Sequence, residues 1–369
     1  MRTRIIIFVS VIQSILWLTH WFIYDTWMAF WAPSSAHEIS ELRIAMIVLS
    51  MTFVAATLLA HNFRNALVSV FYKIAATWLG FVSFFFLASC ACWAVFVVTK
   101  AAGLALDSQA MAATFFGLAA FAAMLGMVNA RWARVTRVSV ALPNLPAAWR
   151  GRVAAIVSDT HLGHVRNYQF IRRIVALLNQ LKPDVVFIPG DYYDGSAVDV
   201  KRLAEPLAKL DAPLGAYFVT GNHEEFRDRT QYIEAMARAG VRVLNNEKVD
   251  VDGVQIVGVH DRELAQKEAY RSVLQQAAIE RDRPSILLAH APHGLPIAEA
   301  EGVSLQVSGH THGGQFFPFT LIAQRVYRQF VHGLERFGNM LVFTNYGAGT
   351  WGPPLRVGTH PEIALIRFE

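Results

Sequence analysis

Metal-binding side chains follow five short apolar runs in the second half of this 369-residue chain. Runs of Val, Ile, Leu and Phe that alternate with helical patterns are typical of buried strands in an α/β sandwich. The runs and the side chains that follow them are 153–157 before Asp159 and His161, 185–188 before Asp191, 216–219 before Asn222 and His223, 286–288 before His290, and 305–307 before His310 and His312. Because ligands of open α/β sheets bind beyond the carboxyl ends of the strands, we expect these groups to meet at one edge. This arrangement predicts a metal site.

The spacing of these residues suits a pair of metal ions. Two ions about 3.5–4 Å apart hydrolyse phosphate esters by supplying a bridging hydroxide as the attacking group and by neutralising charge on the phosphoryl oxygens. One residue separates Asp159 from His161, and one separates His310 from His312. At a strand end, side chains two positions apart project to the same side. A glycine precedes Asp191, where a tight turn lets backbone and side chain approach an ion.

The order of these motifs resembles that of the calcineurin-like metallophosphoesterases. That family's pattern is Asp-x-His, Gly-Asp-x-x-Asp, Gly-Asn-His-Glu, a single His, and Gly-His-x-His. The matching residues here are Asp159-Thr160-His161, Gly190-Asp191 with Asp194, Gly221-Asn222-His223-Glu224, His290, and Gly309-His310-Thr311-His312. Residues 313–315 (Gly-Gly-Gln) and the Gly- and Pro-rich stretch 347–363 are similar to the family's bacterial membrane-associated branch. The resemblance covers residues 133–369 and implies a four-layer α/β/β/α sandwich.

The resemblance also implies a role for each motif residue. It implies two divalent metal ions, one held by Asp159, His161 and His312 and the other by Asn222, His290 and His310. Asp191 would bridge the two ions. His223 would face the phosphate as general acid or transition-state stabiliser. An imidazole beside a ligand Asn can reach the leaving oxygen and donate a proton at neutral pH. Ligation by Asp, Asn and His without thiolate suits Mn, Fe, Zn or Co better than a pure Mg site.

Other polar residues near the motifs are weaker candidates. Those for substrate contact are Asp194, His164, Arg166 and Arg356. The alternative for His164 and Arg166 is plain solvation, and the alternative for Arg356 is an ordinary surface position. We expect His260 to be a structural histidine with satisfied hydrogen bonds and His293 to be a loop residue.

Four stretches in the first half of the chain contain no charged residue. They predict transmembrane helices at about residues 5–24, 44–63, 75–98 and 109–130, since about 20 mostly apolar residues span a bilayer. A signal peptide is the alternative for the first stretch, but it lacks a cleavage site of small residues and three more stretches follow. We therefore expect an all-α membrane domain at residues 1–132, followed by a phosphoesterase domain at 133–369. Cys90 and Cys92 lie inside the third stretch, where a helix points them to different faces and disfavours a disulfide.

The charges of the loops predict an orientation. Lys and Arg are in excess at the N-terminus, between spans two and three, and after span four, at Arg2, Arg4, Arg64, Lys73, Arg131, Arg134 and Arg137. This bias places both termini and the metal-rich half in the cytoplasm. With the branch resemblance, it implies a multi-pass protein of the bacterial inner membrane. Residues 1–139 contain nine Lys/Arg and four Asp/Glu, whereas the rest contains 24 of each, so we expect no nucleic-acid-binding face.

Periodicity predicts the remaining elements of the second half. We expect an edge strand at 135–142, strands at 241–244, 254–259, 340–344 and 363–368, and helices at 167–181, 200–210, 230–239 and 263–279. An aromatic insert, residues 316–330, interrupts this pattern. It is either a loop packed on its own core or an apolar lip beside the metal site that contacts lipid.

These features favour one function over two alternatives. The favoured function is a membrane-anchored phosphodiesterase or pyrophosphatase acting on a phosphorylated or lipid-linked small molecule. UDP-2,3-diacylglucosamine is one such substrate, because some members of this branch hydrolyse it. A catalytically silent membrane scaffold or sensor would not need every ligand intact. A transporter would need polar sites within its spans, and these spans are nearly free of them. We expect the spans to contact membrane lipid and, in an oligomer, one another.

Overall fold

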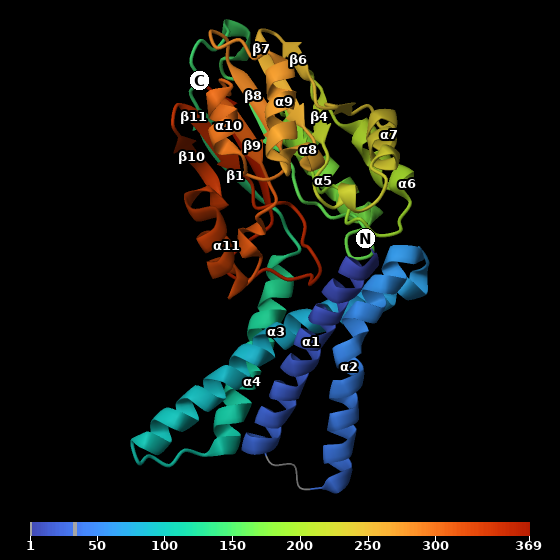
Figure 1. The fold of residues 1–369 in the computed structure, drawn as a ribbon, viewed down its shortest axis with the longest axis vertical. Helices are drawn as coiled ribbons and strands as arrows, with labels where there is room; N and C mark the ends of the chain where they lie inside the picture. Colours follow the sequence, from blue (N-terminus) through green and yellow to red (C-terminus); the bar gives the residue numbers. More distant parts are fainter. Residues whose placement is uncertain (1, 32–34) are drawn as a thin grey trace. The chain divides into compact units, whose positions relative to one another are not determined.

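The computed structural model divides the chain into two units (Figure 1). One unit is Met1–Val128 with Gly352–Val357, and the other is Asn129–Trp351 with Gly358–Glu369. The structure describes residues 2–31 and 35–369, and the side chains of residues 2–5 are not part of that description. The charged groups of Arg2 and Arg4, which enter the predicted orientation, therefore lie outside the described residues.

The first unit consists of four long helices. Their bounds are α1 Arg2–Trp31, α2 Ala36–Asn62, α3 Ala66–Ala101 and α4 Ser108–Asn129. All four are long and apolar enough to cross a membrane, since even the 22 residues of α4 extend about 33 Å at 1.5 Å per residue. The four predicted stretches lie almost entirely within these helices, and each helix except α4 extends well beyond the stretch that predicted it.

Polar side chains inside the helical unit are paired with one another. Trp78 Nε1 donates a hydrogen bond to His20 Nε2 at 2.9 Å, and the other ring nitrogen of His20 lies 2.7 Å from the Leu16 carbonyl. Trp93 Nε1 donates to Thr26 Oγ1 at 3.0 Å. Hydrogen bonds between helices stabilise their packing in an apolar environment. These groups therefore act in packing.

A segment from late in the chain also belongs to the helical unit. Gly352–Val357 packs where α3 and α4 carry glycines. A Cβ at Gly126 would lie 2.6 Å from a methyl group of Val357, and the Gly126 carbonyl accepts a hydrogen bond from the Arg356 amide at 2.9 Å. Small residues let backbones approach closely, so this glycine is required by the close approach.

The second unit contains two six-stranded mixed sheets. The first has the order β1-β12-β2-β3-β4-β5, in which only the β12–β2 pair is antiparallel. Its strands are β1 Arg134–Val140, β12 Glu362–Phe368, β2 Val153–Ile156, β3 Val185–Pro189, β4 Ala216–Val219 and β5 Arg242–Val243. Its helices are α5 Tyr168–Leu181, α6 Val200–Ala204 and α7 Thr230–Arg238.

The second sheet has the order β10-β11-β9-β8-β7-β6, with antiparallel pairs at both edges. Its strands are β10 Gly333–Phe337, β11 Met340–Thr344, β9 Leu305–Ser308, β8 Ser285–Ala289, β7 Val254–Val259 and β6 Lys248–Val251. Its helices are α8 Asp261–Leu264, α9 Lys267–Ala277, α10 Leu295–Ala300 and α11 Phe319–Tyr327.

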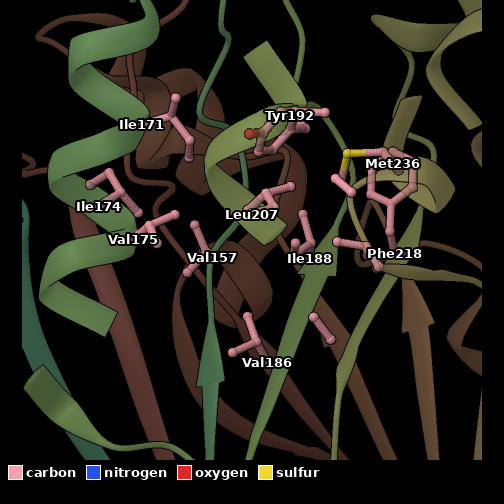
Figure 2. Packing of buried hydrophobic residues seen from close by; sticks show 14 of the residues in the cluster. Val157, Ile171, Ile174, Val175, Val186, Ile188, Tyr192, Leu207, Phe218 and Met236 are labelled. Carbon is pink, nitrogen blue, oxygen red and sulfur yellow. The ribbon is translucent and has the colours of Figure 1, made fainter. Parts of the chain in front are cut away.

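Three apolar clusters show how the layers stack. The central cluster joins both sheets and includes fully buried Ile156, Phe187, Ile256 and Leu288. An outer cluster packs α5 and α7 on the first sheet, as Figure 2 shows for Ile171 and its neighbours. The third packs α9 and α10 on the second sheet. The order of layers is thus helix, sheet, sheet, helix, which confirms the predicted sandwich.

Three predicted elements need correction. The helix predicted at 200–210 is α-helical only to Ala204 and continues as a 3-10 helix, Glu205–Lys209, because Pro206 cannot donate a backbone hydrogen bond. The helix predicted at 263–279 is split into α8 and α9 by the extended backbone of Gln266. The aromatic insert, residues 316–330, is not a loop, since it contains α11 and most of a 3-10 helix, Arg328–Val331.

Candidate metal centre

The strand ends bring all seven predicted ligands and His223 to one site. Asp159 follows β2, Asp191 follows β3, Asn222 follows β4, His290 follows β8 and His310 follows β9. Three overlapping groups have ligand atoms within 4.8 Å of one another: Asp159, His161 and His312; His161, Asp191 and His223; and Asp191, His290 and His310.

Five of these residues adopt a left-handed backbone. They are Asp159 (φ 50°), His161 (φ 45°), Asp191 (φ 50°), His310 (φ 70°) and His312 (φ 48°). This region costs about 1–3 kcal/mol for a residue with a side chain and persists where surrounding structure enforces it. The backbone leaves each strand in a sharp turn, which aims consecutive polar groups inward.

Asp191 lies at the middle of the site. Its Oδ2 is 3.2 Å from His290 Nε2, 3.8 Å from His161 Nε2 and 4.0 Å from His223 Nε2. Its Oδ1 accepts a hydrogen bond from the His223 amide at 2.9 Å. One carboxylate oxygen therefore faces three imidazoles from three different loops.

One side of the site is formed by Asp159, His161 and His312. The rings of His161 and His312 are stacked, with their Nε2 atoms 2.9 Å apart, and His312 Nε2 lies 3.7 Å from Asp159 Oδ1. Both Asp159 oxygens accept the His310 amide at 3.0 Å. A Cβ at Gly309 would come 2.2 Å from Asp159 Oδ2, so this glycine makes room for the carboxylate.

The other side is formed by Asn222, His290 and His310. Asn222 Oδ1 and His310 Nδ1 each lie 3.1 Å from His290 Nε2. His290 Nδ1 lies 2.8 Å from the Pro189 carbonyl, a contact in which that nitrogen donates. Because Nδ1 carries this proton, Nε2 is the atom directed into the site, as in histidine ligands oriented by a second partner.

Charge pairing governs the protonation of Asp191 and His290. Burial opposes ionisation of Asp191, but the His290 and His223 imidazoles outweigh it and hold the pKa of that carboxyl well below its usual range. Burial likewise opposes the charge on His290, while Asp191 raises its pKa well above the usual value. The two residues are therefore an ion pair.

The flanking groups behave differently. Burial, with the Asp191 charge, raises the pKa of Asp159 to about 6, although His290 acts against this. Burial and the charge on His290 lower the pKa of His310 to about 3, so its lone pair is available at neutral pH. A cluster of buried acids and imidazoles that shift one another's pKa values is typical of functional sites.

His223 is oriented by the backbone. Its Nδ1 lies 2.9 Å from the Asp194 carbonyl, to which it donates, and its Nε2 is directed toward Asp191. Its ring contacts that of His161 edge-on, with centroids 4.6 Å apart. Asp194 therefore acts on the site through its main chain.

Comparisons with known proteins agree with this geometry. The family model described as calcineurin-like phosphoesterase matches residues 153–314. An uncharacterized metallophosphoesterase of Helicobacter pylori is 33% identical over 217 residues, covering 58% of each chain. A transmembrane protein with metallophosphoesterase domain from Danio rerio is 33% identical over 265 residues, covering 68% of this chain and 60% of its own. The uncharacterized metallophosphoesterase YkuE of Bacillus subtilis is 29% identical, covering 61% of this chain and 82% of its own.

The chain carries a calcineurin-like phosphoesterase domain. This family implies hydrolysis of phosphoesters with divalent metal ions, and the nitrogen and oxygen donors gathered here fit such ions. The chain spans 58% and 60% of the length of the Helicobacter and Danio relatives. The apolar helices, together with relatives named as transmembrane proteins, indicate a membrane protein.

The phosphoesterase domain contains a support for the site that the motif alone did not reveal. Glu224 is fully buried, and its carboxylate accepts hydrogen bonds from the amides of Gly221 (2.7 Å), Tyr193 (2.8 Å) and Asp191 (3.0 Å). Burial and the Asp191 charge raise the pKa of Glu224 to about 8. One carboxylate thus fixes the two loops that carry Asp191 and Asn222.

A further neighbour of the site comes from the aromatic insert. Tyr327 stacks on His293, with centroids 5.5 Å apart and planes 18° from parallel, and it also lies 6.0 Å from His310. Thr311, between the two histidines of its motif, donates a hydrogen bond to the Val331 carbonyl at 2.7 Å. The insert therefore borders the phosphoesterase site. No local pattern marked Tyr327, because the contact depends on how α11 folds back.

The four weaker candidates for substrate contact lie in different surroundings. His164 is buried and Asp194 is partly buried, and the Asp194 carboxylate accepts hydrogen bonds from the amide and the hydroxyl of Ser196. Arg166 is buried, not solvated: it donates to the Ala130 carbonyl at 2.8 Å and stacks over Phe170. Arg356 is fully buried, not on the surface. Solvation of Arg166 and a surface position for Arg356 are therefore excluded, because neighbours distant in sequence cover both side chains, and contact with substrate stays a prediction for each.

His260 has the satisfied environment predicted for it. Its Nδ1 accepts the Thr220 amide at 3.0 Å, and its Nε2 lies 3.0 Å from Asn245 Oδ1. Burial, reinforced by Arg229, lowers the pKa of His260 to about 4. It is therefore a neutral structural histidine next to the phosphoesterase site.

Proposed function

We propose that the protein is a membrane-anchored phosphoesterase that hydrolyses a phosphodiester or pyrophosphate bond with two divalent metal ions. The observation that carries the proposal is the position of Asp191, whose Oδ2 lies within 4 Å of histidines from both sides of the site. A carboxylate between two sets of nitrogen and oxygen donors is what a bridged pair of ions requires.

Asp159, His161 and His312 are the proposed ligands of one ion, and Asn222, His290 and His310 those of the other. The donor set lacks thiolate and suits Mn, Fe, Zn or Co. When bound, such a pair supplies the nucleophile and neutralises charge on the phosphoryl oxygens. The protein residues supply the fixed geometry: the strained loops, the Glu224 carboxylate and the glycines hold the donors in place before binding.

His223 is the proposed general acid. The Asp194 carbonyl orients its ring, and its Nε2 points into the site. A proton on Nε2 would pass to the leaving oxygen as the phosphorus–oxygen bond breaks.

A lipid-linked substrate is the favoured class. Helix α11 exposes the apolar side chains of Phe319, Leu321, Ile322 and Val326, and its last residue, Tyr327, lies beside His310. Exposed apolar surface of this kind suits an acyl chain or the bilayer surface. A nucleotide-linked lipid such as UDP-2,3-diacylglucosamine combines the required diphosphate with acyl chains.

The proposed setting is the bacterial inner membrane, with the catalytic half in the cytoplasm. The support is the excess of Lys and Arg in three alternate loops. We retain the division into a membrane domain, residues 1–132, and a phosphoesterase domain, residues 133–369. The helices anchor the enzyme and offer surfaces for an oligomer.

The test is hydrolysis by the purified full-length protein. Substrates are UDP-2,3-diacylglucosamine, bis-p-nitrophenyl phosphate and a cyclic nucleotide, each with added Mn²⁺ and after chelation. The proposal expects Mn²⁺-dependent turnover of at least one diester or diphosphate and the highest turnover on the lipid. No hydrolysis of any substrate, with the metal bound, would contradict it.

A further inference from the structure

Two exposed aromatic rings flank His223. Phe226 lies with its ring centroid 4.6 Å from that of His223, and Trp351 lies 6.1 Å away with its plane at 73°. Phe226 is 60% exposed and Trp351 59%, whereas His223 itself is 6% exposed. The two rings therefore border the solvent side of a buried imidazole.

Gln315, from the Gly-Gly-Gln motif, holds Trp351 in place. Its side-chain amide donates to the Trp351 carbonyl at 3.0 Å, and its Oε1 accepts the Trp351 amide at 2.8 Å. Gln315 is buried, has a left-handed backbone (φ 62°), and its own carbonyl accepts a hydrogen bond from Thr359 at 2.7 Å. It is also three residues from His312, so the loop of a proposed ligand fixes the position of Trp351.

Phe226 is held in place by the segment that contains Gly195. It ends the short 3-10 helix Glu224–Phe226, which begins directly after His223. A Cβ at Gly195 would lie 3.0 Å from the Phe226 ring, so the ring packs against a residue without a side chain. Arg227 Nε donates to the Gly195 carbonyl at 3.1 Å and ties the two segments together.

The role of His223 determines what these rings can meet. A general acid must lie within hydrogen-bond reach of the leaving oxygen. The group attached to that oxygen therefore extends from the site past the His223 ring. The rings on the solvent side of His223 are Phe226 and Trp351.

We propose that Phe226 and Trp351 bind the leaving group of the substrate and favour leaving groups that carry a planar ring, with Gln315 as the positioning residue for Trp351. This inference rests on the proposed function, since it requires hydrolysis with His223 as the acid. Offset or edge-on contacts between aromatic rings stabilise a complex beyond simple burial, which supplies the selectivity.

The test compares two diesters whose leaving alcohols are similarly acidic. Methyl phenyl phosphate releases a planar ring, whereas methyl hexafluoroisopropyl phosphate releases a compact group without one. Wild-type enzyme should prefer the phenyl ester through a lower KM. Phe226→Leu and Trp351→Leu should each reduce the preference roughly two- to tenfold by raising KM for the phenyl ester alone.

Matched variants separate this role from folding. Trp351→Phe keeps a ring and should keep most of the preference. Gln315→Ala should reduce the preference for the phenyl ester by raising KM for that ester. Trp132→Leu is the control, because Trp132 is 64% exposed in the same unit. Metal content and melting temperature are measured for every variant.

The outcomes are distinct. A phenyl preference that falls in both leucine variants and survives in Trp351→Phe and Trp132→Leu supports the inference. An unchanged preference in both leucine variants, or equal losses on the two diesters, overturns it while leaving the proposed hydrolysis intact. A wild-type enzyme that binds metal and hydrolyses neither diester nor any substrate of the wider panel overturns the proposed function itself.

Discussion

At the scale of single residues, His223 differs from the other histidines of the site. Two exposed rings, Phe226 and Trp351, border it. Its Nε2 lies 4.0 Å from Asp191 Oδ2, farther than the Nε2 atoms of His290 (3.2 Å) and His161 (3.8 Å). We therefore propose that His223 serves the substrate and not a metal ion.

His223→Ala should keep the wild-type metal content and lose activity. A general acid contributes roughly 10²–10⁴-fold in rate. The loss should be large for a diester with an alkyl leaving group and small for bis-p-nitrophenyl phosphate, whose leaving group needs little protonation. Metal analysis and turnover on the same preparation test this. A variant that has lost metal would show that His223 is a ligand.

His260 should make stability depend on pH. Its pKa in the folded protein, about 4, is below the ordinary histidine value of 6.5, so the unfolded chain binds the additional proton between these two pH values. The contribution, about 3 kcal/mol, is complete above pH 6.5 and is lost as the pH falls toward 4. Arg229 and Glu263 also act on this group, in opposite senses.

The measurement is the melting temperature of wild type and His260→Gln in detergent from pH 7 to pH 4.5. The wild type should be more stable at pH 7, and the difference should narrow as the pH falls. A difference that stays constant over this range would contradict the assignment of the neutral histidine.

The residue types of the site were predictable, but their supports were not. Asp159 and His310 each follow a buried run, and strand order brings such ends together. The left-handed backbone at both positions has no sequence signature in residues that carry side chains. The Gln315–Trp351 pair joins positions 36 apart, so only the folded chain reveals it.

At the scale of elements, the aromatic insert contains both buried and exposed apolar side chains. Phe316 and Ala323 are buried, whereas Phe317, Phe319 and Ile322 are exposed. Aromatic content alone predicted an unusual insert and not a helix, since the helix begins directly after Pro318 and is nine residues long. The edge strands β6 and β10 were missed for a similar reason, because short, half-buried edge strands lack a strong apolar pattern.

Serine at Phe317, Phe319 and Ile322 together should weaken turnover of a lipid-linked substrate. The expected loss is roughly tenfold or more in kcat/KM, since each side chain contributes apolar contact to an acyl chain. Bis-p-nitrophenyl phosphate should be hydrolysed at the wild-type rate. Phe316 is left unchanged because it is buried and its loss would disturb packing.

The control replaces Gln324 and Arg325, which are exposed polar residues of the same helix, with serine. This variant should behave as wild type on both substrates. Equal losses on lipid and soluble substrates in the apolar variant would show that α11 is only structural.

At the scale of the whole molecule, the positive charges imply a direction of insertion. The excess of Lys and Arg lies in residues 1–139, whereas the phosphoesterase half contains equal numbers of basic and acidic residues. From this bias we propose that the residues after Arg137 lie in the cytoplasm and that the loop between α3 and α4 lies outside. The four apolar helices were predictable from composition, because a run of about 20 apolar residues is by itself long enough to span a bilayer.

Cysteine labelling in intact cells tests the orientation. Cys90 and Cys92 are first replaced with alanine, and single cysteines are then placed at exposed Lys201 or at exposed Asp107. An impermeant thiol reagent should label Asp107→Cys from outside and leave Lys201→Cys unlabelled until the cells are lysed. The reverse pattern would invert the proposed topology.

The most direct test of the metal centre is Asp191→Ala, with metal content and turnover measured on one preparation of full-length protein. Asp191 faces histidines of both proposed ion sites, so its loss should lower bound metal below wild type and reduce Mn²⁺-dependent hydrolysis of bis-p-nitrophenyl phosphate to background. Asp211→Ala, at an exposed carboxylate, is the control and should match wild type in both measurements. Near-normal turnover of Asp191→Ala with a full complement of metal would contradict the account.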